Sequence, residues 1–244
     1  MKEKLIIPYK KEFPYSYTLG SYATIELIVS KPKIVERIFI HPDCKNPEYI
    51  VQLCEAENIP VLFGSAAFKR IRQKENTYVL GEFLKYTEKV SSVEPHVVLV
   101  QPSGMGNLGT IIRTLAGFHI RNLAIITPAA DVWNPKTIRA SMGALFRIQC
   151  QQFSSFEEYC SRYEKHKLYP FMLNGKNILQ QGFYLEKELY SLIFGNEATG
   201  LPEYFSQLGT SVKIPQSELV DSLNISVAVG IGVFLFGSAG GQII

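Results

Sequence analysis

An apolar run followed directly by glycines constrains the fold of this chain more than any other feature. Residues 96–101 read His-Val-Val-Leu-Val-Gln, and residues 104–109 read Gly-Met-Gly-Asn-Leu-Gly. Strands that are apolar on both faces are typical of buried parallel sheets. Apolar residues at helical spacing over 108–118 complete a strand, a glycine-rich turn and a helix. This order predicts an α/β fold.

The rest of the second half continues the same alternation. We predict strands at residues 123–127, 147–150, 167–172, 190–195 and 211–214, and helices at 135–142, 156–165 and 222–235. Such a parallel sheet binds ligands beyond the carboxyl ends of its strands. The longest apolar stretch, residues 225–236, is shorter than the roughly 20 residues that cross a bilayer, so we expect a buried helix and no membrane partner.

The first part of the chain predicts a separate, smaller α/β domain. Helical spacing marks residues 22–30, 47–57 and 66–73, and strand-like segments lie at 37–41, 58–63 and 77–83. A polar stretch with no periodicity, residues 85–95, then separates the two halves. We therefore predict one domain over residues 1–90 and a second over 91–244.

Charge and cysteine content narrow the class of protein only slightly. The chain has 25 basic and 22 acidic residues, and a net charge of +3 permits a nucleic-acid partner without indicating one. The four cysteines form no C-x-x-C pair, so we expect no zinc site. We expect reduced thiols in the cytoplasm, because the N-terminal residues also lack the apolar core of a secretion signal.

The glycine-rich turn admits a nucleotide-binding interpretation. Gly104, Gly106 and Gly109 fit G-x-G-x-x-G, and Asp131 follows 22 residues later, which is typical of a dinucleotide site. A nicotinamide-dependent oxidoreductase is therefore one hypothesis. Two observations oppose it: a whole domain precedes the motif, and Asp131 lies beyond the end of the predicted strand. A turn that binds no ligand is also open.

Three further motifs begin in or after this turn. The first contains Asn107 and Arg113, the second Gly195-Asn-Glu197 with Gly200-Leu-Pro202, and the third Ile214-Pro with Ser222-Leu-Asn224-Ile-Ser226. Each alone has a structural explanation, such as a helix cap at Asn107 or Ser222, or a tight glycine loop. Arginine, however, binds phosphate well through its planar fork. Capping at Ser222 also leaves Asn224 and Ser226 unexplained.

In this order and at these separations, the three motifs resemble the signature motifs of the SpoU (TrmH-like) family of RNA 2′-O-ribose methyltransferases, in the SPOUT superfamily. The stretch Asn134-Pro-Lys…Arg139-Ala-Ser141-Met-Gly143 is also typical. The resemblance covers about residues 96–238. One departure is that Gly104-Met105 stands where the family often has Asp-Pro.

The resemblance implies a fold and an activity. The second domain is expected to be a parallel α/β sheet whose C-terminal region forms a deep trefoil knot. The first domain is similar in pattern to a small ribosomal-protein-like α/β domain that binds the RNA substrate. The implied enzyme is a homodimer that uses S-adenosylmethionine and no metal, and it methylates ribosomal RNA in preference to transfer RNA. The oxidoreductase and a non-catalytic RNA-binding protein remain as alternatives.

The resemblance also implies site residues. The expected cofactor-binding residues are Thr127, Gly195, Asn196, Ile214, Ser222 and Leu223. The expected catalytic residues are Arg113, Asn107, Glu197, Ser222 and Asn224. Because arginine is essentially always protonated, we expect Arg113 to position the ribose hydroxyl or its neighbouring phosphate rather than to act as a base.

Overall fold

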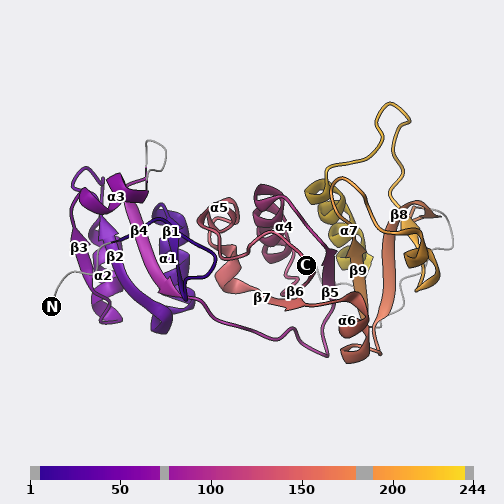
Figure 1. Cartoon of the computed structure of the whole chain (residues 1–244), viewed down its shortest axis with the longest axis horizontal. Coiled ribbons are helices and arrows are strands. Elements are labelled where there is room, and N and C mark those ends of the chain that lie inside the picture. The colour runs from indigo at the N-terminus through magenta and orange to yellow at the C-terminus, as the bar shows by residue number, and fades with distance from the viewer. Residues whose placement is uncertain (1–5, 72–76, 180–188, 240–244) are drawn as a thin grey trace. The chain divides into compact units, whose positions relative to one another are not determined.

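The computed structural model describes residues 6–71, 77–179 and 189–239, which form two compact units (Figure 1). The first unit contains the chain up to Tyr86 together with Asp131–Arg147, and the second contains Thr87–Ala130 and the chain from Ile148 onward. The predicted division at residue 90 was therefore wrong for residues 131–147, which belong to the first unit.

Specific contacts explain why this segment joins the first unit. The Tyr9 hydroxyl donates to the Asp131 carboxylate at 2.5 Å, and the Ser16 hydroxyl donates to the Trp133 carbonyl at 2.5 Å. The Trp133 ring also packs edge-on against the Tyr86 ring, with centroids 4.8 Å apart. A segment distant in sequence thus completes the core of the first unit.

The first unit is built on a four-stranded sheet of order β1-β4-β2-β3. Strand β4 is antiparallel to β1 and β2, and β2 is parallel to β3. The helices and strands of the first unit are β1 (Tyr15–Leu19), α1 (Ser21–Ser30), η1 (Pro32–Ile34), β2 (Val35–Ile40), α2 (Glu48–Ala56), β3 (Val61–Phe63), α3 (Ala66–Ile71), β4 (Val79–Leu84), α5 (Pro135–Ala140) and η2 (Ala144–Arg147). Each of the six segments that the sequence analysis identified here overlaps a helix or strand of the expected type, as far as the described residues extend.

Strand β1 was missed because it contains hydroxyl side chains where an apolar pattern was sought. All five of its residues are buried, including Ser16 and Thr18. The Thr18 hydroxyl accepts from the Gly81 amide at 3.0 Å and shares a hydrogen bond of 2.7 Å with the Thr24 hydroxyl. Because these polar groups find partners, their burial carries little penalty.

The second unit is built on a six-stranded sheet of order β10-β8-β9-β5-β6-β7, and all its pairs are parallel. Its elements are β5 (His96–Val100), α4 (Met105–Gly117), β6 (Asn122–Ile126), β7 (Gln149–Phe153), α6 (Phe156–Arg162), β8 (Lys167–Asn177), β9 (Tyr190–Phe194), η3 (Glu203–Gln207), β10 (Val212–Lys213) and α7 (Ile225–Ala239). The predicted parallel sheet is confirmed.

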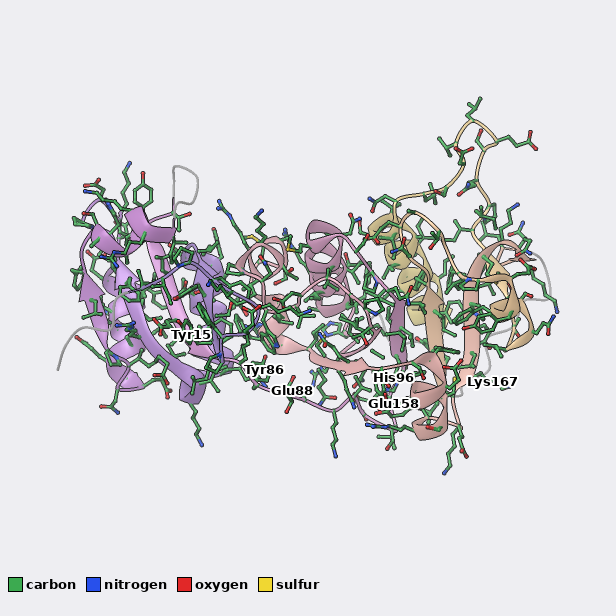
Figure 2. The ribbon with its side chains drawn as sticks, in the orientation of Figure 1. Tyr15, Tyr86, Glu88, His96, Glu158 and Lys167 are labelled. Atoms are coloured by element: carbon green, nitrogen blue, oxygen red, sulfur yellow. The ribbon has the colours of Figure 1, made fainter. Side chains whose placement is uncertain are left out.

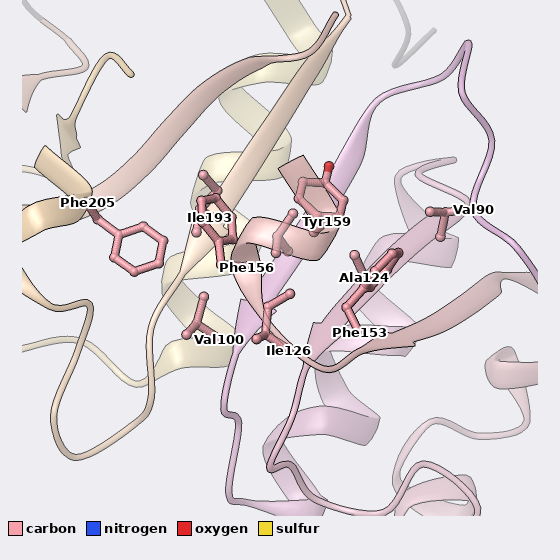
Figure 3. Close-up of a cluster of buried hydrophobic side chains, with 10 residues drawn as sticks. Val90, Val100, Ala124, Ile126, Phe153, Phe156, Tyr159, Ile193 and Phe205 are labelled. Atoms are coloured by element: carbon pink, nitrogen blue, oxygen red, sulfur yellow. The ribbon is translucent and has the colours of Figure 1, made fainter. Parts of the chain in front are cut away.

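Apolar side chains of the central strands and of α6 form one core of this unit. Figure 3 shows Val100, Ile126 and Ile193 from three neighbouring strands gathered with Phe156 and Tyr159 of α6. This packing accounts for the continuous apolar runs that predicted the strands. No helix within the described ranges is long and apolar enough to cross a membrane.

A buried chain of hydrogen bonds joins the amino ends of the strands. His96, which begins β5 (Figure 2), donates from Nε2 to the Ser91 carbonyl at 2.5 Å, so Nδ1 of the neutral ring accepts from the Tyr159 hydroxyl at 2.7 Å. The Ser191 hydroxyl lies 2.5 Å from that of Tyr159 and 2.9 Å from Nδ1 of His166. Burial, followed by the charge of His166, lowers the pKa of His96 to about 4, although the bond to Ser91 opposes the shift.

We predict that acid weakens the fold between about pH 6.5, the pKa of an unfolded histidine, and pH 4. In that window the unfolded state binds the His96 proton and the folded state does not, so the free energy of unfolding falls as the pH falls. The slope for one proton is about 1.4 kcal/mol per pH unit. Urea denaturation across the window measures it, and the exposed His119 provides the control His119→Asn, which should keep the slope. A flat profile, or an NMR titration of His96 near pH 6.5, would contradict the prediction.

Candidate active site

A cavity of about 330 Å³ lies beyond the carboxyl end of β9, where parallel sheets bind ligands. Three segments line most of it: residues 194–200 after β9, residues 212–223 around the end of β10, and the first turns of α7. Five of the six predicted cofactor-binding residues are among the lining residues: Gly195, Asn196, Ile214, Ser222 and Leu223.

Thr127 is the exception, because it is not among the residues that line this cavity. It follows β6, and its hydroxyl donates to the Phe153 carbonyl at 3.1 Å. The cavity lies instead at the ends of β9 and β10. Thr127 therefore holds the ends of β6 and β7 together.

The loop after β9 is compact because its glycines let two stretches of backbone meet. A Cβ on Gly195 would lie 2.2 Å from the carbonyl carbon of Gly200, so no side chain fits there. Gly200 has a φ of +67° and donates its amide to the Asn196 carbonyl at 2.9 Å. The Asn196 side chain donates to the Gln101 carbonyl at 2.7 Å, which ties the loop to the end of β5.

The segment of residues 212–223 offers unpaired backbone to the cavity. Within the described residues, the backbone amides and carbonyls of Ile214, Ser222 and Leu223 make no hydrogen bond. Polar backbone groups beside a cavity require partners, which water or a ligand supplies. This segment can therefore bind a ligand through its main chain.

The Glu197 carboxylate connects the loop after β9 to the start of α4. Its Oε2 accepts from the amide and hydroxyl of Ser103, both at 2.8 Å. Its Oε1 accepts from the Gly104 amide at 2.9 Å and from Nδ2 of Asn107 at 3.3 Å. Although burial raises the pKa of Glu197, hydrogen bonds from the Ser103, Glu197 and Gly104 amides lower it to about 2. Glu197 is therefore a fixed anion at neutral pH.

Asn107 extends this hydrogen-bonded network to the start of α7. Its Oδ1 accepts from Nδ2 of Asn224 at 3.2 Å. Asn224 also caps α7, because its Oδ1 accepts from the amide of Ser226 at 2.9 Å and from the Ser226 hydroxyl at 2.7 Å. The cap is therefore Asn224 and not Ser222, which the sequence analysis had considered for this role. Glu197, Asn107 and Asn224 bring all three motifs together.

Arg113 lies apart from this network. It is exposed on α4, six residues and about 9 Å along the axis from Asn107, and it does not line the cavity. Within the described residues it has no hydrogen-bond or ion-pair partner. The structure therefore joins three of the five predicted catalytic residues, places Ser222 on the cavity, and leaves Arg113 as a free cation nearby on α4.

The dinucleotide interpretation of the glycine-rich turn is not supported by its contacts. The Ser103 and Gly104 amides already bind Glu197, whereas a dinucleotide site presents amides at this turn to a pyrophosphate. Asp131, the expected ribose-binding acid, belongs to the first unit and accepts from Tyr9 and the Trp133 amide.

Among the residues with described positions, no group of three or more His, Cys, Asp or Glu side chains can hold a metal ion.

Two residues of the site were missed in the sequence analysis. Ser103 was not identified, since a serine in a loop gives no sequence signal until its partner is known. Gly104 was noted only as a turn glycine, yet a Cβ there would lie 2.9 Å from Oε1 of Glu197.

Comparison with known sequences gives a consistent family. The model of the SpoU rRNA Methylase family matches residues 94–234, more than half of the 244 residues. An uncharacterized tRNA/rRNA methyltransferase from Synechocystis sp. is 30% identical over 59% of this chain, which spans 54% of that relative's length. The 23S rRNA (guanosine(2553)-2′-O)-methyltransferase RlmP from Bacillus subtilis is 23% identical over 86% of this chain and 84% of its own length.

Comparison with solved structures concerns the fold. The SpoU methyltransferase AviRb from Streptomyces viridochromogenes, in complex with the cofactor AdoMet, matches with a TM-score of 0.78 at 19% identity. The match covers 94% of this chain and 91% of that one. The two chains thus share an α/β fold with a parallel sheet.

We predict that Gly195→Ala disrupts the loop after β9, because its methyl group would meet the backbone of Gly200 and Leu201. Overpacking of this kind costs about 1–3 kcal/mol of unfolding free energy. Gly106→Ala is the matched control: a Cβ there meets nothing within 4 Å, so it should leave stability unchanged or raise it by up to about 1 kcal/mol. Thermal and urea unfolding measure both, and equal stabilities for the two variants would contradict the packing described.

Proposed function

The chain belongs to the SpoU rRNA methylase family, and from this membership we propose that it transfers a methyl group from S-adenosylmethionine to a ribose 2′-hydroxyl of RNA. The observation that carries the proposal is the hydrogen-bonded connection of Glu197, Asn107 and Asn224 beside the cavity, since it joins residues from all three motifs. The Bacillus relative, whose name specifies a 2′-O-methyltransferase, supports the same reaction.

The cavity fits S-adenosylmethionine in chemical character. Its unpaired backbone groups at Ile214, Ser222 and Leu223 suit the hydrogen-bonding edges of an adenine and a ribose. The charged lining residues are Glu197 and Asp221, which are acidic, and Lys213, which is basic, so the excess negative charge complements a positively charged ligand. Gly195, Asn196, Ile214, Ser222 and Leu223 would hold the cofactor. When bound, S-adenosylmethionine supplies a methyl group attached to a positively charged sulfur. Because the sulfur leaves as a neutral thioether, the transfer requires no metal.

Arg113 is the residue we assign to the RNA. A ribose hydroxyl is a poor nucleophile at neutral pH and must be oriented while it loses its proton. The exposed Arg113 guanidinium, unpaired within the described residues, binds the target ribose or the phosphate beside it. Since it stays protonated, the proton passes to a phosphate oxygen or water. Asn107, held by Glu197, orients the start of the same helix.

We propose ribosomal RNA as the substrate, in preference to transfer RNA. The Bacillus relative, named for 23S rRNA, aligns over 86% of this chain and thus over most of both units. The first unit is then the RNA-binding domain of ribosomal-protein-like type. The exposed Lys69 and Arg70 on α3 support this role, and the basic residues Arg72 and Lys74, which follow in the sequence, lie outside the described residues.

Three further properties are proposed. A deep trefoil knot in the C-terminal region is proposed from the membership of the family. A homodimer is supported by α7, where the apolar side chains of Val227 and Phe234 are 49% and 51% exposed. A cytoplasmic location is supported by the four cysteines, which are all free thiols.

The proposed function predicts that labelled methyl from S-adenosylmethionine appears on ribosomal RNA as 2′-O-methyl nucleotides. Arg113→Ala should lower the rate about 100-fold or more, because it removes the charge that binds the reacting ribose. Its affinity for S-adenosylhomocysteine should be unchanged, since Arg113 does not line the cavity. The matched control is Arg121→Ala, which removes another exposed arginine of the same unit.

The outcomes separate the alternatives. Label on transfer RNA alone would overturn the ribosomal substrate but keep the chemistry. RNA binding without transfer by the wild type would indicate a non-catalytic RNA-binding protein. If NAD stabilised the protein and S-adenosylhomocysteine did not, the result would favour a nicotinamide-dependent oxidoreductase that binds its cofactor at the glycine-rich turn.

The RNA-binding role of the first unit predicts a salt-dependent loss of affinity in Lys69→Ala/Arg70→Ala. Removing two phosphate contacts should reduce the slope of log affinity against log salt by about two. The KM for RNA should rise while kcat stays the same. Lys33→Ala, which removes an exposed charge elsewhere in the unit, is the control. An unchanged salt slope in the double variant would remove α3 from the interface.

A further inference from the structure

We propose that Ser103 is a positioning residue for methyl transfer, which fixes the Glu197 carboxylate so that Asn107 and Asn224 are held in one arrangement. The inference rests on the proposed function and adds a residue outside the three motifs. Ser103 lies in the loop between β5 and α4 and does not line the cavity, so it acts through Glu197 rather than on a ligand.

The side chain and the backbone of Ser103 both donate hydrogen bonds to one oxygen of Glu197. Its amide and its hydroxyl both donate to Oε2, each at 2.8 Å. Hydrogen bonds to a charged acceptor are about twice as strong as neutral ones. With Oε2 held by two donors, the carboxylate plane is fixed, and Oε1 can face only the Gly104 amide and Asn107.

The orientation of Asn107 depends on these two hydrogen bonds from Ser103 to Glu197. Its Nδ2 donates to Oε1 at 3.3 Å, the longest of the four bonds to Glu197, so a small rotation of the carboxylate breaks it first. The same amide group presents Oδ1 to Asn224 at 3.2 Å, and Asn224 caps α7. Loss of the Ser103 hydroxyl therefore disturbs the contact between α4 and α7.

Among the residues that the structure describes, only Ser103, Gly104 and Asn107 donate hydrogen bonds to the Glu197 carboxylate. Gly104 has no side chain, and a Cβ there would lie 2.9 Å from Oε1. The charged residues that share the cavity lining with Glu197 are Lys213 and Asp221, and neither bonds to it within the described part of the chain. Alanine at position 103 thus leaves Oε2 with one donor.

The chain contains a matched control for this arrangement. Ser154 donates its amide and hydroxyl to Oε2 of Glu158 at 2.8 and 2.6 Å, in the same geometry, at the start of α6 (Glu158 is labelled in Figure 2). Ser154→Ala removes the same kind of bond from a site that lines no part of the cavity. It therefore reports the cost of the bond to the fold alone.

The test compares Ser103→Ala, Ser103→Thr and Ser154→Ala in the full chain. We expect Ser103→Ala to lower kcat for RNA methylation about 10-fold, with the Kd for S-adenosylhomocysteine changed less than twofold. NMR titration of the Glu197 carboxyl carbon should show a higher midpoint in Ser103→Ala. Ser103→Thr, which keeps a hydroxyl, should restore both values. Ser154→Ala should match the wild type in kcat and in the Glu197 titration.

Contrary results have distinct meanings. Wild-type kcat and an unmoved Glu197 titration in Ser103→Ala would overturn the proposal. An equal loss of kcat in Ser154→Ala would also overturn it, because the effect would then be one of general stability. Absence of methyl transfer by the wild type would refute the proposed function instead, while the Glu197 titration would still test the contact.

Discussion

The site depends on one partly buried anion, the Glu197 carboxylate. Glu197 leaves the carboxyl end of β9 and places its carboxylate on the backbone amides that precede α4. Desolvation opposes an ionised carboxylate, and the hydrogen bonds from Ser103, Gly104 and the Glu197 amide together overcome that cost. Through this contact, β9, α4 and α7 are connected by hydrogen bonds that no sheet or helix supplies.

The parallel sheet makes this contact possible. Because β5 and β9 are adjacent and parallel, the turn before α4 and the loop after β9 emerge at the same edge. The loop after β9 can then fold tightly, since Gly195 lets Gly200 approach its backbone. The opposite ends of the strands have a different character: the chain of hydrogen bonds from His96 to His166 is buried, so we assign it to stability.

Much of this architecture could be predicted because it follows from local patterns. The apolar run at His96 indicated a buried parallel strand, and the motif residues Glu197, Asn107 and Asn224 were identified before their contact was known. Features that depend on distant partners could not be found this way. Strand β1 was missed because Ser16 and Thr18 are buried with hydrogen bonds, and the place of Asp131 depends on Tyr9. Ser103 and the cap at Asn224 were likewise visible only in the fold.

We propose that S-adenosylmethionine binds through the backbone after β9 and β10. The amides that begin the glycine-rich turn bind the Glu197 carboxylate instead of a ligand. Amide hydrogen exchange with and without S-adenosylhomocysteine tests it most directly. The account predicts new protection at Gly195, Asn196, Ile214 and Leu223, with no change at Gly106 and Thr127. Protection centred on residues 104–109 instead, by this ligand or by NAD, would contradict it.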